Sequence, residues 1–228
     1  MTIHLRPSAP IAPDVLVPGD PARAMELAQL LLVEPKMHNL HRGLWGYTGE
    51  TPGGRPLSVQ STGMGAPSAA IVLHELAALG ARRAIRTGTC GALDESLRLG
   101  ELLRVEAALP EDGVSRSAGA DGPVRADPEL FARLAAAGAG EPVTVATSDV
   151  FYEDTDEPRR RWVAAGASAV EMETAALYVL GRRLGVATAC LLVVSDVFPG
   201  GERRRITDPE LARSVEAMGR AAAAALAD

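Results

Sequence analysis

The stretch ATACLLVVSD, residues 187–196, decides the fold class of this 228-residue chain. It is rich in residues that favour β-structure and is almost wholly apolar up to Val194, which is typical of a central strand covered on both faces. The apolar run is too short to cross a bilayer. Ser195 and Asp196 follow it directly, so they lie at the carboxyl end of the predicted strand, where open α/β sheets commonly bind ligands.

Strand-like and helix-like segments alternate along the chain without a long linker, which favours one α/β domain over residues 1–228. Glycine and proline mark the ends of many segments. The predicted strands cover residues 15–17, 44–47, 57–60, 82–86 and 143–147, and the predicted helices cover 22–32, 67–79, a segment ending near Leu184 and a segment beginning at Asp208. We expect the strand at 82–86 to break at Gly88 and Gly91, and residues 111–128 to form a surface excursion with weak structure.

The composition excludes several classes of protein. A hydrophobic content of 47% with 23% charged residues is ordinary for a globular chain, and a net charge of −6 argues against a general nucleic-acid binder. The first ten residues contain no continuous apolar stretch, so they are not a signal peptide. Cys90 and Cys190 lie far apart in apolar or Gly-rich surroundings, which indicates buried, reduced thiols in a soluble cytoplasmic protein.

Two Gly-rich segments beside predicted strands suit a small anion. In Gly19–Arg23 the glycine lets an anion approach the backbone, the following helix presents its free N–H groups, and Arg23 adds a fork of donors. Taken alone, that segment equally fits a capped helix with a solvent-facing arginine. In Arg86–Gly91 an arginine, the hydroxyl of Thr89 and two glycines form a compact oxyanion site. The P-loop spacing and its lysine are absent, so nucleoside triphosphate binding is rejected.

Two acidic segments suit a sugar and a proton donor. Glu171 and Glu173 lie at a strand-to-helix junction, where a carboxylate can accept from both hydroxyls of a ribose, although Glu173 would also favour the helix N-terminus electrostatically. Asp196, partly removed from water at the end of an apolar strand, can hold a proton and donate it. Capping of a loop is the alternative role for Asp196. The Gly-rich and basic segment 199–205 suggests a mobile loop that brings an arginine to the site.

The order and spacing of seven motifs resemble those of the nucleoside phosphorylase family. The motifs are GDPAR (19–23), HRGLWGYTG (41–49), TGMGAPS (62–68), RTGTCG (86–91), SDVFY (148–152), VEMET (170–174) and VSD (194–196). The resemblance covers nearly the whole chain and points to the hexameric branch, which holds bacterial purine nucleoside phosphorylases and uridine phosphorylases. It implies a single three-layer α/β/α domain with a central mixed, twisted β-sheet.

The resemblance also implies roles for particular residues. Phosphate would be bound by Gly19, Arg23, Arg86 and Thr89, with Thr89 in place of the more usual serine, and by Arg42 from a neighbouring subunit. The ribose would be bound by Met64, Glu171, Met172 and Glu173, and its 5′-hydroxyl by His4 from a neighbouring subunit. The assembly would be a hexamer built as a trimer of dimers. Neither a metal nor a cofactor is implied, because inorganic phosphate is a co-substrate.

The resemblance assigns the base to Phe151, Ser195 and Asp196, with Asp196 as the general acid that protonates N7 of a purine. Arg203 would assist it, but the segment after Asp196 is shorter than in the best-known purine enzymes, which leaves Arg204 and Arg205 as alternatives. These roles fit the reaction. The base leaves an oxocarbenium-like sugar and needs its negative charge neutralised, while phosphate must be held below the anomeric carbon.

The implied function is phosphorolysis of purine nucleosides to a free base and (deoxy)ribose 1-phosphate in nucleoside salvage. An acid at position 196 favours purines, because uridine phosphorylases bind uracil through a Gln–Arg set that this chain lacks. The alternatives are a uridine phosphorylase, a phosphate-independent nucleosidase of the same fold, such as a methylthioadenosine nucleosidase without the arginine set, and a non-catalytic nucleoside-binding protein. A nucleic-acid binder that uses residues 159–161 and 203–205 is a weaker alternative, since such runs are usually solvated.

Overall fold

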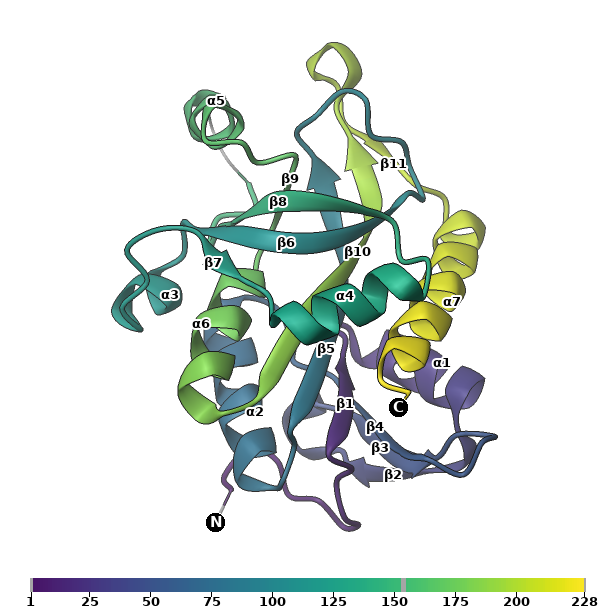
Figure 1. Ribbon diagram of the computed structural model, residues 1–228. Coiled ribbons are helices and arrows are strands. Elements are labelled where there is room, and N and C mark those ends of the chain that lie inside the picture. Colours follow the sequence, from purple (N-terminus) through teal and green to yellow (C-terminus); the bar gives the residue numbers. More distant parts are fainter. Residues whose placement is uncertain (1, 153–154, 228) are drawn as a thin grey trace.

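The apolar run at residues 187–194 is part of strand β10 (Ala187–Val197), at the centre of the molecule (Figure 1). The computed structural model describes residues 2–152 and 155–227, and in it every residue from 188 to 196 is buried. The strand therefore continues past Val194 and includes both Ser195 and Asp196. Their side chains are held by the strand itself rather than by the loop that follows it.

The other elements surround β10 (Figure 1). In the described ranges the remaining strands are β1 (Asp14–Val17), β2 (Val33–Asn39), β3 (Gly46–Glu50), β4 (Pro56–Gln60), β5 (Arg83–Ala92), β6 (Leu102–Pro110), β7 (Val124–Arg125), β8 (Glu141–Thr147), β9 (Ala169–Glu171) and β11 (Arg204–Arg205). The helices are α1 (Pro21–Leu31), α2 (Ala66–Ala78), α3 (Gly113–Ser117), α4 (Pro128–Ala136), α5 (Glu157–Ala164), α6 (Thr174–Leu184) and α7 (Asp208–Ala225), with short 3₁₀ turns at His41–Gly43 and Pro199–Gly201.

Strand β5 corrects one prediction, because it runs without a break through Gly88 and Gly91 to Ala92. It pairs in parallel with β1 over its first residues and with β10 along almost its whole length. Pairing with β10 fixes the extended backbone at Gly88 and Gly91, with β9 as a second partner at Gly91, and outweighs the low strand preference of glycine. Gly88 serves packing, since a Cβ there would lie 2.7 Å from the guanidinium carbon of Arg86.

Two smaller predictions also change. The segment 111–128, predicted to have weak structure, contains helix α3 and strand β7, and β7 pairs with β6. Asp112 begins α3 by accepting a hydrogen bond from the backbone N–H of Ser115 at 2.7 Å, a local cap that stabilises a short helix. The strand predicted at 44–47 lies further along the chain, at 46–50, where it forms a hairpin with β4.

The described strands form one mixed sheet in which five strands close on themselves. β10 pairs with β5 on one side and with β6 on the other, and the series β6–β8–β9–β5 completes the ring. β1, β4, β3 and β2 continue the sheet outward from β5 as an open extension. The strands that carry the candidate catalytic residues, β5 and β10, therefore have paired neighbours on both sides.

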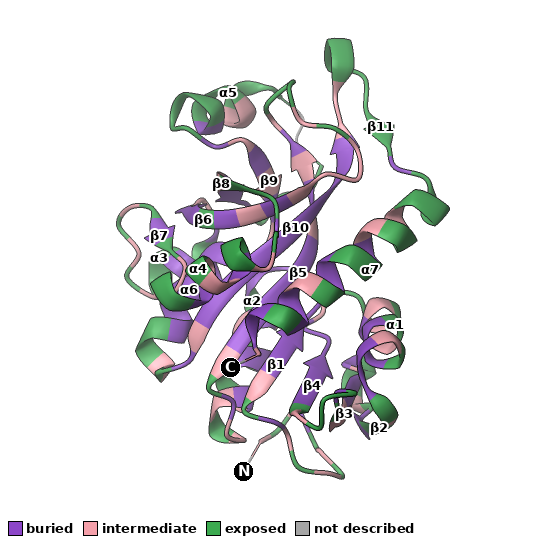
Figure 2. Ribbon diagram, turned by 45° about the vertical axis from the view of Figure 1, so that its right-hand side comes forward, coloured by how far each residue is buried: buried purple, intermediate pink, exposed green. Residues whose placement is uncertain are grey.

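Helices cover the two faces of the sheet, as predicted for a three-layer fold. α1, α4 and α7 pack on one face and α2, α3 and α6 on the other (Figure 1). Alternate residues of β10 enter different cores: Leu192 and Val194 contact the α2–α6 side, whereas Leu191 and Val193 contact the α1–α7 side. Figure 2 shows the central strands as the buried part of the molecule. Within residues 2–152 and 155–227, no helix combines the length and apolarity needed to span a bilayer.

Candidate active site

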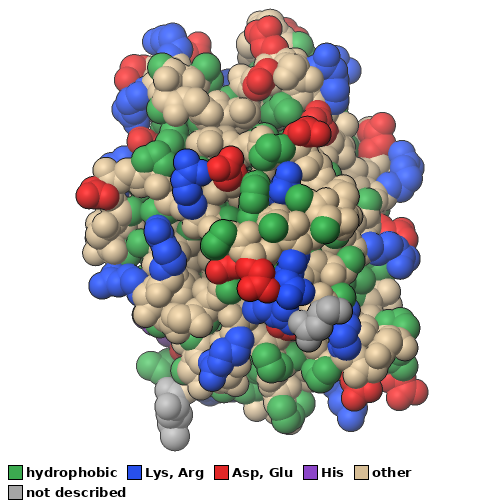
Figure 3. All heavy atoms as spheres, viewed as in Figure 1, with side chains coloured by type: hydrophobic (Ala, Val, Ile, Leu, Met, Phe, Trp, Pro, Cys, Tyr) green, Lys and Arg blue, Asp and Glu red, His purple; other side chains and the backbone are tan. Residues whose placement is uncertain are grey.

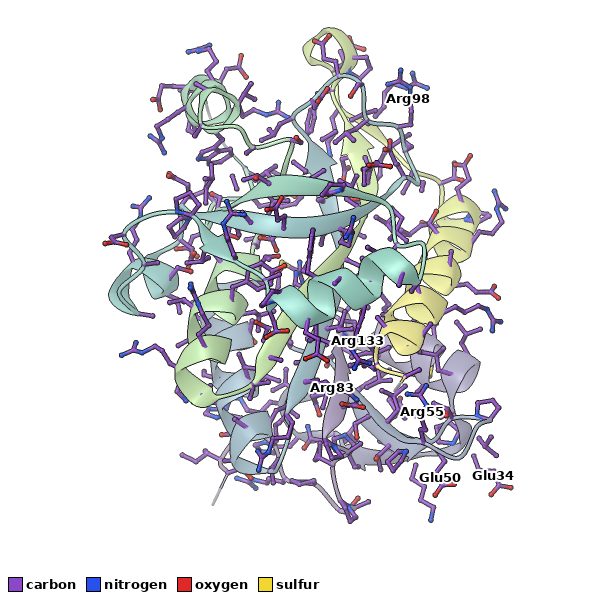
Figure 4. All side chains as sticks on the ribbon, viewed as in Figure 1. Glu34, Glu50, Arg55, Arg83, Arg98 and Arg133 are labelled. Carbon is purple, nitrogen blue, oxygen red and sulfur yellow. The ribbon has the colours of Figure 1, made fainter. Side chains whose placement is uncertain are left out.

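Four of the sheet strands end at the same edge and bring the predicted clusters together. β1 is parallel to β4 and to β5, and β5 is parallel to β10. Their carboxyl ends lead into residues 18–23, 61–65, 93–100 and 198–203. Asp196 lies near the end of β10, whereas Arg86 and Thr89 lie within β5, with Arg86 opposite Val17 at the end of β1. The opposite end of β1 and β5 carries a structural ion pair, in which Arg83, labelled in Figure 4, contacts Asp14 at 2.6 Å.

Arg23 lies in the first turn of α1, which begins at Pro21 after the N-cap Asp20. Asp20 accepts from the backbone N–H of Ala22 at 2.9 Å, which fixes the start of the helix. One terminal nitrogen of Arg23 is 3.5 Å from the carbonyl oxygen of Thr87 on β5. Burial lowers the pKa of Arg23; the charge of Asp20 opposes this effect, and the nearby charge of Arg86 adds to it. The charges of Arg23 and Arg86 act on each other, and this repulsion favours binding of an anion near both groups.

Arg86 is buried on β5 and holds both glutamates of the VEMET motif. Its Nε donates to Glu171 at 3.0 Å, and one terminal nitrogen contacts Glu173 at 2.5 Å. Although burial opposes it, the charges of Glu173 and Glu171 raise the pKa of Arg86 above its usual value. These pairings leave the other terminal nitrogen, Nη1, for a further ligand. The side chain has room to bend in this way only because residue 88 is glycine.

The two glutamates have different surroundings. The carboxylate of Glu171 has no exposed side-chain surface, and it accepts from the hydroxyl of Thr147 at 2.5 Å and from the backbone N–H groups of Glu173 and Thr174. The Glu171 carboxylate thus binds protein groups, namely Arg86, Thr147 and two backbone N–H groups. Glu173 accepts from the backbone N–H of Gly65 at 2.6 Å and pairs with Arg86. Burial raises the pKa of Glu173, although Arg86 opposes the shift.

Asp196 is buried at the end of β10 and has three polar neighbours. Ser195 donates its hydroxyl to Oδ2 of Asp196 at 2.7 Å, and Nε of Arg203 donates to Oδ1 at 2.8 Å. Arg205 lies further away, with its Nη1 at 3.4 Å from Oδ1. β11 pairs with β10 so that Arg205 is opposite Asp196 and Arg204 is opposite Val197. Because side chains alternate along a strand, Arg204 points to the other face.

An aromatic side chain lies beside this acid. The guanidinium carbon of Arg203 is 5.0 Å from the centre of the Phe151 ring, and Phe151 is half exposed. Asp196 is the register partner of Gly91 on β5, and Thr89 pairs with Val193. Strand β5 therefore carries Arg86 and also pairs, at Gly91, with the strand that carries Asp196.

A cavity of about 970 Å³ opens beside the acid end of the site. It lies between α5, the segment after β5 and the turn between β10 and β11, where Figure 3 shows a dip between two lobes at the top of the molecule. Phe198 forms part of its wall, and the guanidinium carbon of Arg159 lies 3.6 Å from the centre of the Phe198 ring. Arg98, labelled in Figure 4, and Arg204 also line it, whereas Asp196 and Glu173 do not.

His4 lies away from the ribose end of this chain's own site, and the described contacts of the site do not include Arg42. The ring of His4 is 2.9 Å from Glu75, ten residues along α2 from Gly65, whose N–H contacts Glu173. At 1.5 Å per residue this separation is roughly 15 Å. Arg42 is exposed in the 3₁₀ turn with a φ of 60°, an uncommon conformation for a residue with a side chain. Met64 lies next to Gly65 and is 79% exposed.

The remaining predicted residues lie at the same edge of the sheet. Gly19 follows β1, and a Cβ there would be 3.2 Å from the carbonyl oxygen of Gly63. Thr89 is half-buried on β5, and Met172 is half-buried between the two glutamates. Both predicted cysteines are free and buried, and burial raises the pKa of Cys190 to about 12.

Sequence reasoning missed several groups that complete the site. The backbone N–H of Gly65 and the hydroxyl of Thr147 hold the two glutamates, and Gly88 makes room for Arg86. Thr87 has a fully buried hydroxyl without a hydrogen-bond partner in the described part of the chain. A signal existed for three of them, since Gly65 lies within the TGMGAPS motif and Thr87 and Gly88 lie within the RTGTCG motif. Thr147 gave none, because its contact with Glu171 spans 24 residues.

Comparisons with known proteins show which chains this one is similar to. Residues 13–228 match the family model described as the phosphorylase superfamily. A DeoD-type purine nucleoside phosphorylase of Clostridium beijerinckii is 38% identical over 218 residues, which cover 89% of each chain. One from Caldanaerobacter subterraneus subsp. tengcongensis is 38% identical over 211 residues, covering 89% of this chain and 90% of the relative. The crystal structure of a uridine phosphorylase from Vibrio fischeri superposes with a TM-score of 0.84 at 25% identity, covering 95% of this chain and 92% of that one.

Proposed function

The chain belongs to the phosphorylase superfamily, and from this premise we propose that it cleaves purine nucleosides with inorganic phosphate, releasing the free base and (deoxy)ribose 1-phosphate for salvage. The observation that carries the proposal is the pairing of Arg86 with Glu173 at one end of the site and of Arg203 with Asp196 at the other. One end suits an anion beneath a sugar, and the other suits a departing base.

The phosphate would lie between Arg23 and Arg86. Further donors would be the backbone N–H of Arg23 and the hydroxyl of Thr89, because Pro21 has no N–H and that of Ala22 donates to Asp20. The N-terminal end of α1 adds a favourable dipole. Glu173 keeps acceptor capacity for a ribose hydroxyl, because a carboxylate offers about four acceptor positions and the contacts with Gly65, Met172 and Arg86 use three. Met64 and Met172 would pack against the sugar. We assign Glu171 to holding Arg86 in place.

Asp196 would donate a proton to N7 of the purine as the glycosidic bond breaks. The guanidinium of Arg203 and the hydroxyl of Ser195 then stabilise the carboxylate that remains. Phe151 would stack against the base. Proton transfer neutralises the charge that develops on the leaving base, while phosphate attacks the anomeric carbon from the opposite side.

We further propose that the working enzyme is an oligomer, a hexamer built from dimers, in which His4 and Arg42 act on the site of a neighbouring subunit. Support comes from the placement of His4 against Glu75, which lies roughly 15 Å along α2 from Gly65, the residue whose N–H contacts Glu173. Arg42 supports it as well, because an exposed arginine is held there with a positive φ. The buried free thiols suit the cytoplasm. Analytical ultracentrifugation of the purified chain tests the assembly, and a sedimenting monomer that retains full activity contradicts it.

Incubation of inosine, adenosine, guanosine, their 2′-deoxy forms and uridine with and without phosphate tests the reaction. We expect base release from the purine nucleosides only when phosphate is present, with ribose 1-phosphate as co-product. Equal release without phosphate would identify a hydrolase. Turnover of uridine alone would identify a uridine phosphorylase, and tight binding without any turnover would identify a nucleoside-binding protein.

A further inference from the structure

The carboxylate of Glu75 on α2 binds the N-terminal arm of the chain. It accepts from the backbone N–H groups of Ile3 at 2.9 Å, His4 at 3.0 Å and Leu5 at 2.6 Å. It also contacts Nδ1 of the His4 ring at 2.9 Å. Four donors from three consecutive residues converge on one side chain, although nothing in the phosphorolysis reaction requires a charge at this place.

The charge of Glu75 is essential to this arrangement. Burial alone would raise the pKa of Glu75, but the backbone N–H groups of Leu5, His4 and Ile3 and the ring of His4 lower it to about 2. Hydrogen bonds to an ionised acceptor are about twice as strong as neutral ones. Leu5, fully buried in the core on the α2 side, anchors the arm beside them. The arm is therefore fixed at both its backbone and its His4 side chain.

The same contact determines which nitrogen of His4 is available. An ionised carboxylate only accepts hydrogen bonds, so Nδ1 carries the proton and Nε2 becomes the acceptor in the neutral ring. A second contact holds the backbone, because the ring of His41 approaches the carbonyl oxygen of His4 at 3.1 Å. His4 thus presents an oriented acceptor, and about a quarter of its side chain is exposed.

The exposed face of α2 offers a surface on which a second copy of the chain could pack beside His4. Pro67, Ile71, His74 and Ala78 form an exposed stripe along the helix, and three of the four are apolar. A two-fold axis near Ile71 would pack this stripe antiparallel against that of a second copy. Glu75, four residues after Ile71, would then lie opposite Pro67 of the other copy, which is four residues before Ile71 and in the first turn of α2. That turn lies beside the ribose end of the site, where Gly65 contacts Glu173.

We propose that Glu75 is a positioning residue, which holds His4 so that its Nε2 accepts a hydrogen bond from the 5′-hydroxyl of a nucleoside bound to the adjoining subunit. The inference rests on the proposed function, because it assumes that His4 meets the 5′-hydroxyl across a dimer. Glu75 touches no substrate atom. Its effect passes entirely through the tautomer and the placement of the His4 ring.

The readout is the ratio of kcat/KM for inosine to kcat/KM for 5′-deoxyinosine, which lacks the hydroxyl. Glu75→Gln keeps the size of the side chain but turns an NH₂ group toward donors, so we expect the ratio to fall about tenfold. His4→Ala should lower the ratio by a similar factor, and Glu75→Gln in the His4→Ala background should lower it no further. Glu216→Gln, which removes an exposed helical ion pair with Arg220 on α7, is the matched control and should leave the ratio unchanged.

Each outcome decides between distinct failures. A ratio that falls with His4→Ala but not with Glu75→Gln overturns the role of Glu75 and leaves the proposed function intact. A ratio that stays constant in both variants removes His4 from the 5′-hydroxyl and overturns the inference with it. A general loss of folding or assembly in Glu75→Gln would reduce turnover of both nucleosides alike, and such an equal loss also overturns a positioning role. Phosphate dependence, measured in the same assays, tests the reaction separately.

Discussion

Arg86 bends back over Gly88, two residues further along the same strand, so that its guanidinium occupies the space where a Cβ of residue 88 would stand. That Cβ would lie 2.7 Å from the guanidinium carbon and 2.9 Å from a methyl carbon of Leu192, so at least one of these side chains would have to shift. The absent side chain at position 88 is therefore a requirement for the pairing of Arg86 with both glutamates.

Gly88→Ala should displace Arg86 from Glu171 and Glu173. Overpacking of a filled core costs roughly 1–3 kcal/mol of unfolding free energy, and loss of the arginine geometry should raise KM for phosphate by about tenfold or more. Thermal unfolding and phosphate-dependent kinetics measure the two effects. Gly122→Ala is the control, since a Cβ at Gly122 meets nothing within 4 Å. Unaltered phosphate kinetics in Gly88→Ala would show that Arg86 does not need its observed position.

Asp196→Asn should slow turnover of inosine and guanosine much more than it weakens phosphate binding. An amide cannot supply the proton that N7 needs when the base leaves, and loss of such a general acid commonly costs 10²–10⁴-fold in kcat. A nucleoside already methylated at N7 carries a positive charge there and needs no proton. We expect Asp196→Asn to retain most of its activity on that substrate. Equal losses on both substrates would remove Asp196 from the role of acid.

The three consecutive arginines of the basic segment should differ in effect. Arg203 contacts Asp196 at 2.8 Å and Phe151 through its guanidinium, whereas Arg204 lines the neighbouring cavity. Arg203→Ala should lower kcat by roughly 10²-fold through lost stabilisation of the carboxylate, and Arg204→Ala should change kcat little. Steady-state kinetics on inosine compares them. A larger effect at Arg204 than at Arg203 would contradict the assignment.

His38 should make the fold sensitive to acid. It is buried on β2, and burial lowers its pKa from 6.5 to about 4, so the folded protein keeps the ring neutral. Between these two pH values the unfolded chain binds more protons than the folded one. The free energy of unfolding is therefore unaffected by His38 above pH 6.5 and decreases as the pH falls from 6.5 through 4. The expected loss is about 3 kcal/mol.

Chemical denaturation of the parent chain and of His38→Gln between pH 7 and pH 4 measures this contribution. The variant should lose less stability than the parent over the same interval, because its side chain does not titrate. Other groups titrate equally in both proteins and cancel in the comparison. Parallel stability curves would show that His38 does not carry the effect.

The sequence was most informative where a pattern was local. The apolar run at 187–194 predicted a buried central strand, and Asp20 followed by Pro21 predicted the start of α1. Where structure depends on distant partners, local rules failed. Gly88 and Gly91 were expected to end a strand, and only the pairing of β5 with β10, about a hundred residues away, keeps that strand extended. Strands β2 and β6 were not predicted at all.

The candidate site shows the same division. The motifs predicted a common site for Arg23, Arg86, Glu173 and Asp196. In the structure Arg86 pairs with Glu173 and lies near Arg23, whereas the described partners of Asp196 are Ser195, Arg203 and Arg205. The choice among Arg203, Arg204 and Arg205 depended on the register between β11 and β10, which residue spacing did not predict. The full burial of Glu171 depends on Thr147, from a separate strand.

The closed ring of strands has a consequence for how the enzyme can move. Arg86 and Asp196 lie on β5 and β10 at positions with a strand partner on each side. Arg86 pairs with Val17 and Cys190, and Asp196 pairs with Gly91 and Arg205. The backbone amides of Arg86 and Asp196 should be among the slowest of the chain to exchange hydrogen with deuterated water, because opening them requires the ring itself to open. The distance between Arg86 and Asp196 should then stay constant during turnover. Conformational change on substrate binding should be confined to the loops that surround the site.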